Sequence, residues 1–201
     1  MKKIKFIFDL DGTVTSQETL PLIASHFGVQ EKIEELTRQT IKGNVPFVES
    51  FIKRVHILGN LSVSGINDLL ENVPLYPELH RFITANADKC AIATGNLSCW
   101  VGKLSAKIGC TAFCSDAEVK DDRVVKLTSI LRKENVVQRY KGEGCEVVYI
   151  GDGNNDLEAM RLADIAIADG VTHSPAMSIL GVADYVIYTE EALCRQLNQL
   201  L

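Results

Sequence analysis

The chain has 201 residues, of which 46% are hydrophobic and 23% are charged, and its formal net charge is −5. This length fits one sizeable domain, or a domain with a small insertion, that buries a core without disulfides or a structural metal. The acidic balance and the lack of a basic cluster argue against nucleic acid and anionic membranes as partners.

The start of the chain and its cysteines predict a cytoplasmic protein. The apolar run that begins at Ile4 is interrupted at Lys5 and ends at Asp9, which is too short for the apolar region of a secretory signal. No apolar run approaches the length of a membrane span. The six cysteines are therefore expected to be reduced thiols rather than disulfide partners. Both a monomer and a homodimer are compatible with the sequence.

The first apolar run, residues 4–8, predicts a strand that is buried on both faces. Residues 17–72 then show helical periodicity and no convincing strand, between linkers near residues 13–16 and 73–77. We therefore predict a small helical cap over residues 15–76. Residues 1–14 and 77–201 are expected to form the core domain.

Further apolar runs at residues 90–93, 146–150, 164–167 and 184–187 predict four more strands. Amphipathic stretches at residues 97–108, 125–137 and 155–162 predict helices. The turn at residues 120–123, between valines, predicts a short β-hairpin over residues 118–125. Strands that alternate with helices predict an α/β fold, here a Rossmann-like three-layer core whose parallel sheet is covered on both faces.

Polar residues follow three of the predicted strands. Asp9 and Asp11 follow the first strand, residues 94–96 (Thr-Gly-Asn) follow the second, and residues 151–156 (Gly-Asp-Gly-Asn-Asn-Asp) follow the third. The carboxyl ends of parallel strands meet at one edge of a sheet, and ligands bind there. We therefore expect these residues to form a single site.

The carboxylates of this expected site suit Mg²⁺ together with a phosphate. Asp9, Asp11, Asp152 and Asp156 offer hard oxygen ligands, which Mg²⁺ prefers. A phosphate dianion alone would be repelled by roughly 4 kcal/mol for each unit-charge pair near 4 Å at an effective dielectric of about 20. A divalent ion and a lysine are needed to reverse that balance.

A lysine and several neutral donors are expected to hold the phosphate. Lys126 is the preferred lysine, because it follows the predicted hairpin and opens the next predicted helix, whereas Lys133 and Lys141 are the alternatives. Hydroxyl and amide groups at the strand ends are the expected neutral donors: Leu10, Thr94 and Gly95.

The ordered set of motifs resembles the haloacid dehalogenase superfamily of phosphohydrolases. Residues 9–13 (Asp-Leu-Asp-Gly-Thr) match its first motif, Thr94 the second, Lys126 the third and residues 151–156 the fourth. Each motif alone is weak, but four in the family's order, spread across most of the chain, form a specific signal. The resemblance implies hydrolysis of a phosphate monoester through a covalent phospho-aspartate, with Mg²⁺ as the cofactor.

The resemblance also implies roles for individual residues. Asp9 is the expected nucleophile, and Asp11 is the expected general acid that later acts as the base. Asp9, the backbone carbonyl of Asp11, and Asp152 are the expected ligands of Mg²⁺. Asp156 is expected behind them, and Asn155 is expected beside the phosphate or a metal-bound water.

A helical insertion directly after the first motif resembles the phosphoserine phosphatase branch. This resemblance implies that Glu18 meets a substrate amine, Arg54 meets a substrate carboxylate, and Phe47 covers the site. Such contacts suit an amino-acid phosphate such as phosphoserine. Gly12 and Asn96 depart from the branch, which commonly has serine and glycine there, and Asn96 adds a side chain near the expected substrate backbone.

Several alternatives remain at this point. A surface arginine and a helix N-terminal acid are the structural alternatives for Arg54 and Glu18. A phosphotransferase would pass the phosphoryl group to a small alcohol, such as a homoserine-like acceptor, and a regulatory protein would bind the ester without turnover. In each case the expected partner is a small-molecule phosphate ester. The four histidines show no metal spacing and are expected to be structural or at the surface.

Overall fold

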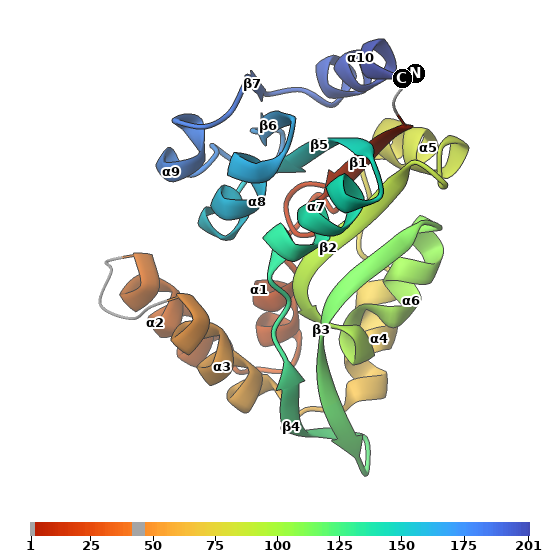
Figure 1. The fold of residues 1–201 in the computed structure, drawn as a ribbon. Coiled ribbons are helices and arrows are strands. Elements are labelled where there is room, and N and C mark those ends of the chain that lie inside the picture. The colour runs from red at the N-terminus through yellow and green to blue at the C-terminus, as the bar shows by residue number, and fades with distance from the viewer. Residues whose placement is uncertain (1–2, 42–46) are drawn as a thin grey trace.

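The computed structural model describes residues 3–41 and 47–201. Within them lies one sheet with the strand order β4-β3-β2-β1-β5-β6-β7 (Figure 1). Neighbouring strands are parallel, except that β3 and β4 are antiparallel. The expected α/β fold with a mainly parallel sheet is confirmed. The strands are β1 (Lys3–Phe8), β2 (Cys90–Leu97), β3 (Thr111–Lys120), β4 (Arg123–Ser129), β5 (Cys145–Gly151), β6 (Ile165–Asp169) and β7 (Tyr185–Ile187).

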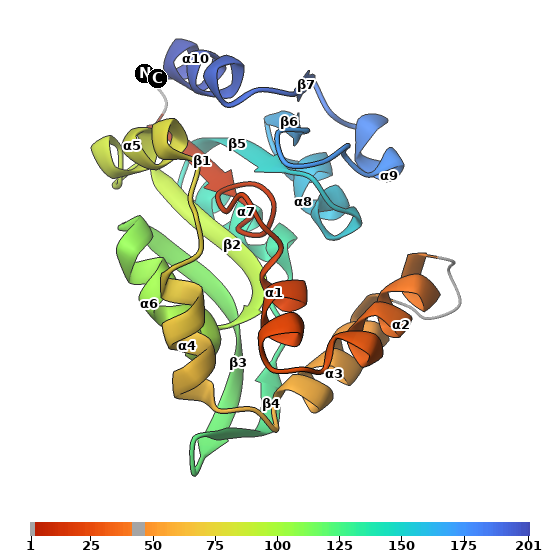
Figure 2. The same ribbon diagram turned by 180° about the vertical axis from the view of Figure 1, so that it is seen from behind.

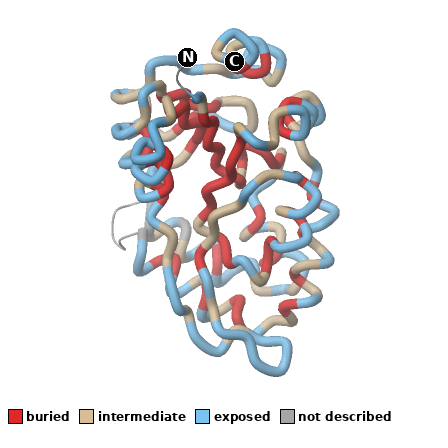
Figure 3. Tube along the Cα trace, turned by 45° about the vertical axis from the view of Figure 1, so that its right-hand side comes forward, coloured by how far each residue is buried: buried red, intermediate tan, exposed pale blue. Residues whose placement is uncertain are grey.

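Helices cover both faces of the sheet, because alternate side chains of the buried strands point to opposite sides. Phe6 and Phe8 of β1 belong to one core cluster, and Ile7 belongs to the other. The first cluster includes α5 (Pro77–Ala85), α6 (Ser98–Ile108) and α10 (Glu190–Leu200), and the second includes α7 (Lys133–Gly142), α8 (Leu157–Leu162) and α9 (Met177–Leu180). Figures 2 and 3 show the fold from behind and the buried strands at its centre.

The insertion after β1 contains α1 (Thr19–His26), α2 (Gln30–Ile41), α3 (Phe47–Leu58) and α4 (Val63–Glu71). α2 and α3 lie against each other and project from the core, whereas α4 lies along α6 (Figures 1 and 2). The two linkers meet at an antiparallel bridge between Thr15 and Leu75. The described helices thus fall inside the predicted insertion, and its limits at residues 15 and 76 stay a prediction.

The hairpin formed by β3 and β4 is longer than the sequence predicts. Asp121 and Asp122 form its turn with φ of 49° and 60°, as a two-residue hairpin turn requires. The predicted helix over residues 125–137 is wrong before residue 133, because residues up to Ser129 pair with β3 and α7 begins at Lys133. Pairing with a neighbouring strand overrides a weak helical periodicity.

The remaining global features concern membranes and thiols. Across residues 3–41 and 47–201, no helix is long and apolar enough to span a membrane. All six cysteines are free thiols in the structure.

Candidate active site

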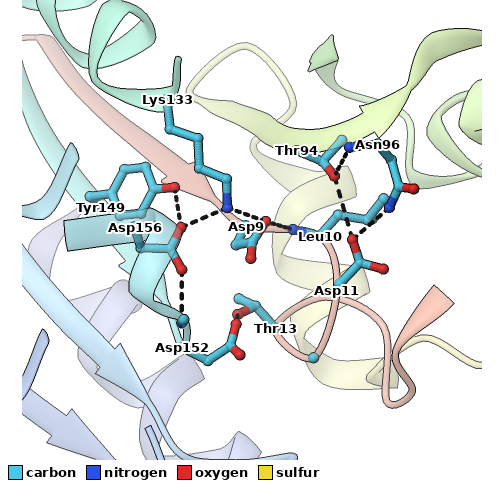
Figure 4. Close-up of polar contacts among 12 residues, drawn as sticks. Asp9, Leu10, Asp11, Thr13, Thr94, Asn96, Lys133, Tyr149, Asp152 and Asp156 are labelled. Carbon is cyan, nitrogen blue, oxygen red and sulfur yellow. Dashed lines mark hydrogen bonds and ion pairs between the residues drawn. The ribbon is translucent and has the colours of Figure 1, made fainter. Parts of the chain in front are cut away.

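The carboxyl ends of β1, β2 and β5 lie side by side. Phe8 of β1 pairs with Ile92 of β2 on one side and with Ile150 of β5 on the other. The residues at and just after these strand ends therefore converge at one edge of the sheet, as Figure 4 shows. The convergence expected from the sequence is what the strand order produces.

Asp9 is buried and held in place by two contacts. Its side-chain oxygen Oδ1 accepts a hydrogen bond from the Leu10 amide at 2.7 Å and pairs with Lys133 Nζ at 2.6 Å. Burial raises the pKa of Asp9, Lys133 opposes this rise, and three neighbouring carboxylates add to it. The Leu10 amide, expected at the phosphate, thus orients Asp9 instead. With Oδ1 held, Oδ2 is the oxygen best placed to react with a ligand.

Lys133, rather than Lys126, lies beside Asp9. Its Nζ is 2.6 Å from Asp9 Oδ1 and 2.7 Å from Asp156 Oδ1, and its side chain is only 3% exposed. Burial disfavours its charge, but the two carboxylates outweigh burial and raise the pKa of Lys133. Lys126 is exposed on β4, and Lys141 pairs with a surface carboxylate. The assignment of Lys126 is therefore corrected, because the longer hairpin moves the start of the helix to Lys133.

Asp11 is held by side chains from two other segments, and Figure 4 shows one of them, with Thr94 and Asn96. Its Oδ1 accepts hydrogen bonds from the Thr19 hydroxyl and, at 3.0 Å, from the Thr19 amide. Its Oδ2 accepts a hydrogen bond from Asn96 Nδ2 at 2.7 Å, and the Thr94 hydroxyl lies 3.5 Å away. Burial raises the pKa of Asp11, and the Thr19 hydrogen bonds lower it. A carboxyl group with a raised pKa beside Asp9 is suited to donate a proton.

Asp156 is fully buried behind Asp9 and Asp11 and accepts several hydrogen bonds. Its Oδ1 accepts a hydrogen bond from the Tyr149 hydroxyl at 2.7 Å in addition to the contact with Lys133, and its Oδ2 accepts one from the Gly153 amide at 2.9 Å. A Cβ at Gly151 would lie 2.5 Å from Asp156 Cγ. Glycine at the end of β5 is therefore required for this approach.

The carboxylates converge as a cation site requires. One oxygen from each of Asp9, Asp152 and Asp156 lies within 4.8 Å of the others. Asp152 is 5% exposed, and its Oδ1 accepts a hydrogen bond from the Thr13 hydroxyl at 3.1 Å. Three buried carboxylates opposed by Lys133 leave excess negative charge on hard oxygen donors. This donor set fits Mg²⁺.

A pocket connects these carboxylates to the insertion. Burial raises the pKa of Glu18 to about 7. Burial also lowers the pKa of Arg54, and the negative charge of Glu18 opposes that decrease. Phe47 begins α3, but its side chain lies outside the described residues. Phe51, one turn further along α3, lines the pocket instead. The lining residues are Asp9, Asp11, Glu18, Leu20, Phe51, Arg54, Gly95, Asn96, Asp152, Gly153 and Asn155.

His173 joins the site unexpectedly. Its Nε2 lies 3.1 Å from Asp152 Oδ2 and 3.2 Å from Glu18 Oε1. These contacts, with that to Asp152 the strongest, raise the pKa of His173 to about 10. His173 is exposed, as expected of a surface histidine, but the sequence did not predict its contacts with Asp152 and Glu18. The available signal was its position shortly after β6, since a fourth parallel strand ends at the same edge.

Comparisons with known proteins agree with this geometry. The family model for haloacid dehalogenase-like hydrolases matches residues 6–164. The phosphoserine phosphatase of Saccharomyces cerevisiae is 31% identical over 179 residues, which cover 81% of this chain and 58% of that protein. The phosphoserine phosphatase of Methanocaldococcus jannaschii is 28% identical over 183 residues, which cover 83% of this chain and 85% of that protein. The chain thus spans just over half of the yeast relative.

Solved structures show the same fold. A haloacid dehalogenase family hydrolase from Salmonella enterica serovar Typhi superposes with a TM-score of 0.83 at 23% identity, covering 96% of this chain and 70% of that chain. A phospho-aspartyl intermediate analogue of phosphoserine phosphatase superposes with a TM-score of 0.80 at 24% identity, covering 98% and 99%. The expected resemblance is confirmed. The chain belongs to the haloacid dehalogenase-like hydrolase family.

Proposed function

We propose that this protein is a Mg²⁺-dependent phosphomonoester hydrolase that forms a covalent phospho-aspartate on Asp9. The observation that carries the proposal is the pairing of a buried Asp9, held through Oδ1 by Lys133, with a neighbouring Asp11 whose pKa is raised by burial. A group that only binds phosphate has no need of a proton donor beside a fixed carboxylate. The relatives named above are phosphoserine phosphatases, which have the same type of activity.

In the first step, Asp9 attacks phosphorus and the ester oxygen leaves as an alcohol. The bond from Asp9 to phosphorus forms, the ester bond to phosphorus breaks, and Asp11 gives its proton to the departing oxygen. In the second step, the ionised Asp11 takes a proton from a water that attacks the phospho-aspartate. Inorganic phosphate leaves and Asp9 is regenerated.

The surrounding residues hold and balance charge during both steps. Lys133, Thr94 and Asn155 are the proposed contacts of the phosphoryl oxygens, with Lys133 in the place first expected for Lys126. Asp9, the Asp11 carbonyl and Asp152 are the proposed ligands of Mg²⁺, which neutralises charge on the phosphoryl group when bound. Positioning and charge stabilisation of this kind supply most of the acceleration in phosphoryl transfer.

The substrate we propose is a small amino-acid phosphate, such as phosphoserine or a close relative. Glu18 and Arg54 line the same pocket as Asp9, so an acid and an arginine face a bound ester from the insertion. An ammonium group suits Glu18, and a carboxylate suits Arg54. We further propose that residues 15–76 act as a cap whose closure excludes bulk water.

The mechanism is tested by phosphate release from a generic phosphate ester with Mg²⁺, with a chelator, and with Asp9→Asn. We expect activity only in the wild-type protein with the metal present, and a phosphorylated chain that can be trapped by rapid quenching. Full activity of Asp9→Asn would refute the mechanism. Added acceptor alcohols measure transfer, because a phosphotransferase would yield new esters in place of free phosphate.

The substrate is tested with a panel of phosphorylated metabolites read by phosphate release. We expect Arg54→Ala to raise KM for the preferred ester by about 100-fold, as loss of a charge-assisted contact predicts, and to change hydrolysis of a generic ester far less. Arg54→Lys is the matched control for charge without the paired guanidinium donors. An unchanged preference in Arg54→Ala would contradict the amino-acid substrate.

A further inference from the structure

Glu18, Asp152 and His173 converge beside the catalytic carboxylates. His173 Nε2 lies 3.1 Å from Asp152 Oδ2 and 3.2 Å from Glu18 Oε1, and donor atoms of the three side chains all lie within 4.8 Å of one another. Donors about 2.1 Å from a shared metal ion stand roughly 3.0–3.4 Å apart in octahedral or tetrahedral sites. The spacing at His173 therefore matches that of ligands around one cation.

The same three donor atoms surround the bare Cα of Gly12. A Cβ at Gly12 would lie 3.1 Å from Glu18 Oε1, 3.1 Å from His173 Nε2 and 3.4 Å from Asp152 Oδ2. Gly12 also has a φ of +73°, a conformation that side chains disfavour. Any side chain here would compete for the space between the donors. Glycine thus leaves a small cradle that a single ion can fill.

The second nitrogen of His173 has the partner that a metal-binding histidine usually has. Nδ1 lies 3.2 Å from the backbone carbonyl oxygen of Ser174, which can only accept a hydrogen bond. When Nε2 gives up its proton for a metal ion, the proton that stays on Nδ1 keeps this hydrogen bond, and the lone pair of Nε2 points to the cradle. Metal-ligating histidines are commonly oriented by this kind of hydrogen bond to a carbonyl or carboxylate.

A further carboxylate adds negative charge to the cradle. Asp169 at the end of β6 is only 1% exposed, and among the described residues its Oδ2 has no hydrogen-bond partner. The charge of Asp169 interacts with both Asp152 and His173. Once ionised, the three carboxyl groups outnumber the single imidazole, and their negative charge favours a bound cation.

We propose that Glu18, Asp152 and His173 form a second divalent-cation site that takes a borderline ion such as Zn²⁺ and shares Asp152 with the proposed Mg²⁺ site. An imidazole nitrogen with two carboxylate oxygens is a donor set for Zn²⁺ rather than for Mg²⁺. Asp152 Oδ2 faces this cradle, while Asp152 Oδ1 accepts a hydrogen bond from the Thr13 hydroxyl. If Glu18 binds substrate as proposed above, Zn²⁺ in the cradle competes with substrate; the binding itself does not rest on that function.

The test is equilibrium dialysis of the full chain against Zn²⁺ in excess Mg²⁺, with bound zinc measured by atomic absorption. We expect one tightly bound Zn²⁺ per wild-type chain and a loss of affinity of at least about tenfold in His173→Ala. Gly12→Ala should also weaken binding, although it removes no ligand. His80→Ala is the matched control, because this histidine lies on α5 and contacts the Lys107 carbonyl instead.

Three outcomes would overturn the site: no zinc on the wild-type chain, wild-type affinity in His173→Ala, or an equal loss in His80→Ala. Thermal melts by circular dichroism establish that each variant is folded, and His173→Gln serves as a second variant if alanine lowers stability. Phosphate release is not the readout. A failure of the proposed hydrolase function would therefore leave the zinc result standing, and a failure of zinc binding would leave the hydrolase mechanism untouched.

Discussion

Replacement of Lys133 by methionine is expected to destabilise the fold and disable the site. Lys133 Nζ lies 2.6 Å from Asp9 Oδ1 and 2.7 Å from Asp156 Oδ1, with the lysine side chain 3% exposed. At an effective dielectric of about 20, each such pair contributes roughly 6 kcal/mol before the cost of burying the charges. Methionine retains most of the volume but leaves two buried carboxylates together. Their protonation limits the net loss to about 3–5 kcal/mol of unfolding free energy.

Urea unfolding measures this loss, and phosphate release in Mg²⁺ measures the activity. We expect kcat to fall by about 100- to 1,000-fold, since a charge that faces the phosphoryl group is removed. Lys126→Met is the matched control. It changes an exposed lysine on β4, so stability should stay within about 0.5 kcal/mol. Wild-type stability and turnover in Lys133→Met would refute the reasoning, as would an equal loss in Lys126→Met.

Three further substitutions test the polar network. Asn96→Ala removes the donor at 2.7 Å from Asp11 Oδ2, and we expect kcat to fall about tenfold to a hundredfold with little change in KM; an effect on KM alone would mean that Asn96 only contacts substrate. Tyr149→Phe leaves Asp156 without one donor and should cost about 2 kcal/mol in urea unfolding, whereas no cost would mean that the hydrogen bond adds nothing. Asp169→Asn tests a pKa that burial raises from 3.8 to about 7. Because the folded state holds this proton more tightly than the unfolded state, the wild-type protein loses up to about 4 kcal/mol as the pH rises from about 4 to about 7. The Asp169→Asn variant should lack this part of the pH dependence. A wild-type protein that is equally stable in urea at about pH 4 and about pH 7 would contradict the prediction.

Much of the site was predictable because it lies at strand ends. Two short apolar runs are each followed by a pair of carboxylates, Asp9 with Asp11 and Asp152 with Asp156. This pattern predicts which carboxylates lie at the carboxyl edge of the sheet. Parallel pairing then brings these ends together, whatever lies between them in the sequence. For this reason the sequence predicts that the carboxylates, Thr94 and Asn96 lie together. It does not predict the partner of Asn96, which was expected to be the substrate and is Asp11 in the structure.

The lysine was misassigned because strand pairing is a long-range property. Residues 125–129 have a helical periodicity of their own, and only their pairing with β3 makes them a strand. That pairing moves the start of α7 by several residues. As a result Lys133 enters the buried space between two carboxylates, whereas Lys126 stays in solvent.

The sequence by itself determined the α/β class, the helical insertion, and the acidic strand ends that suit a divalent metal and a phosphate. Those features follow from local patterns and from the geometry that every parallel sheet shares. Only the tertiary structure decided which lysine neutralises Asp9, which side chains hold Asp11, and that His173 reaches Glu18 and Asp152 over the bare face of Gly12. These contacts join residues far apart in the chain, so they depend on how loops and helices pack rather than on any local signal.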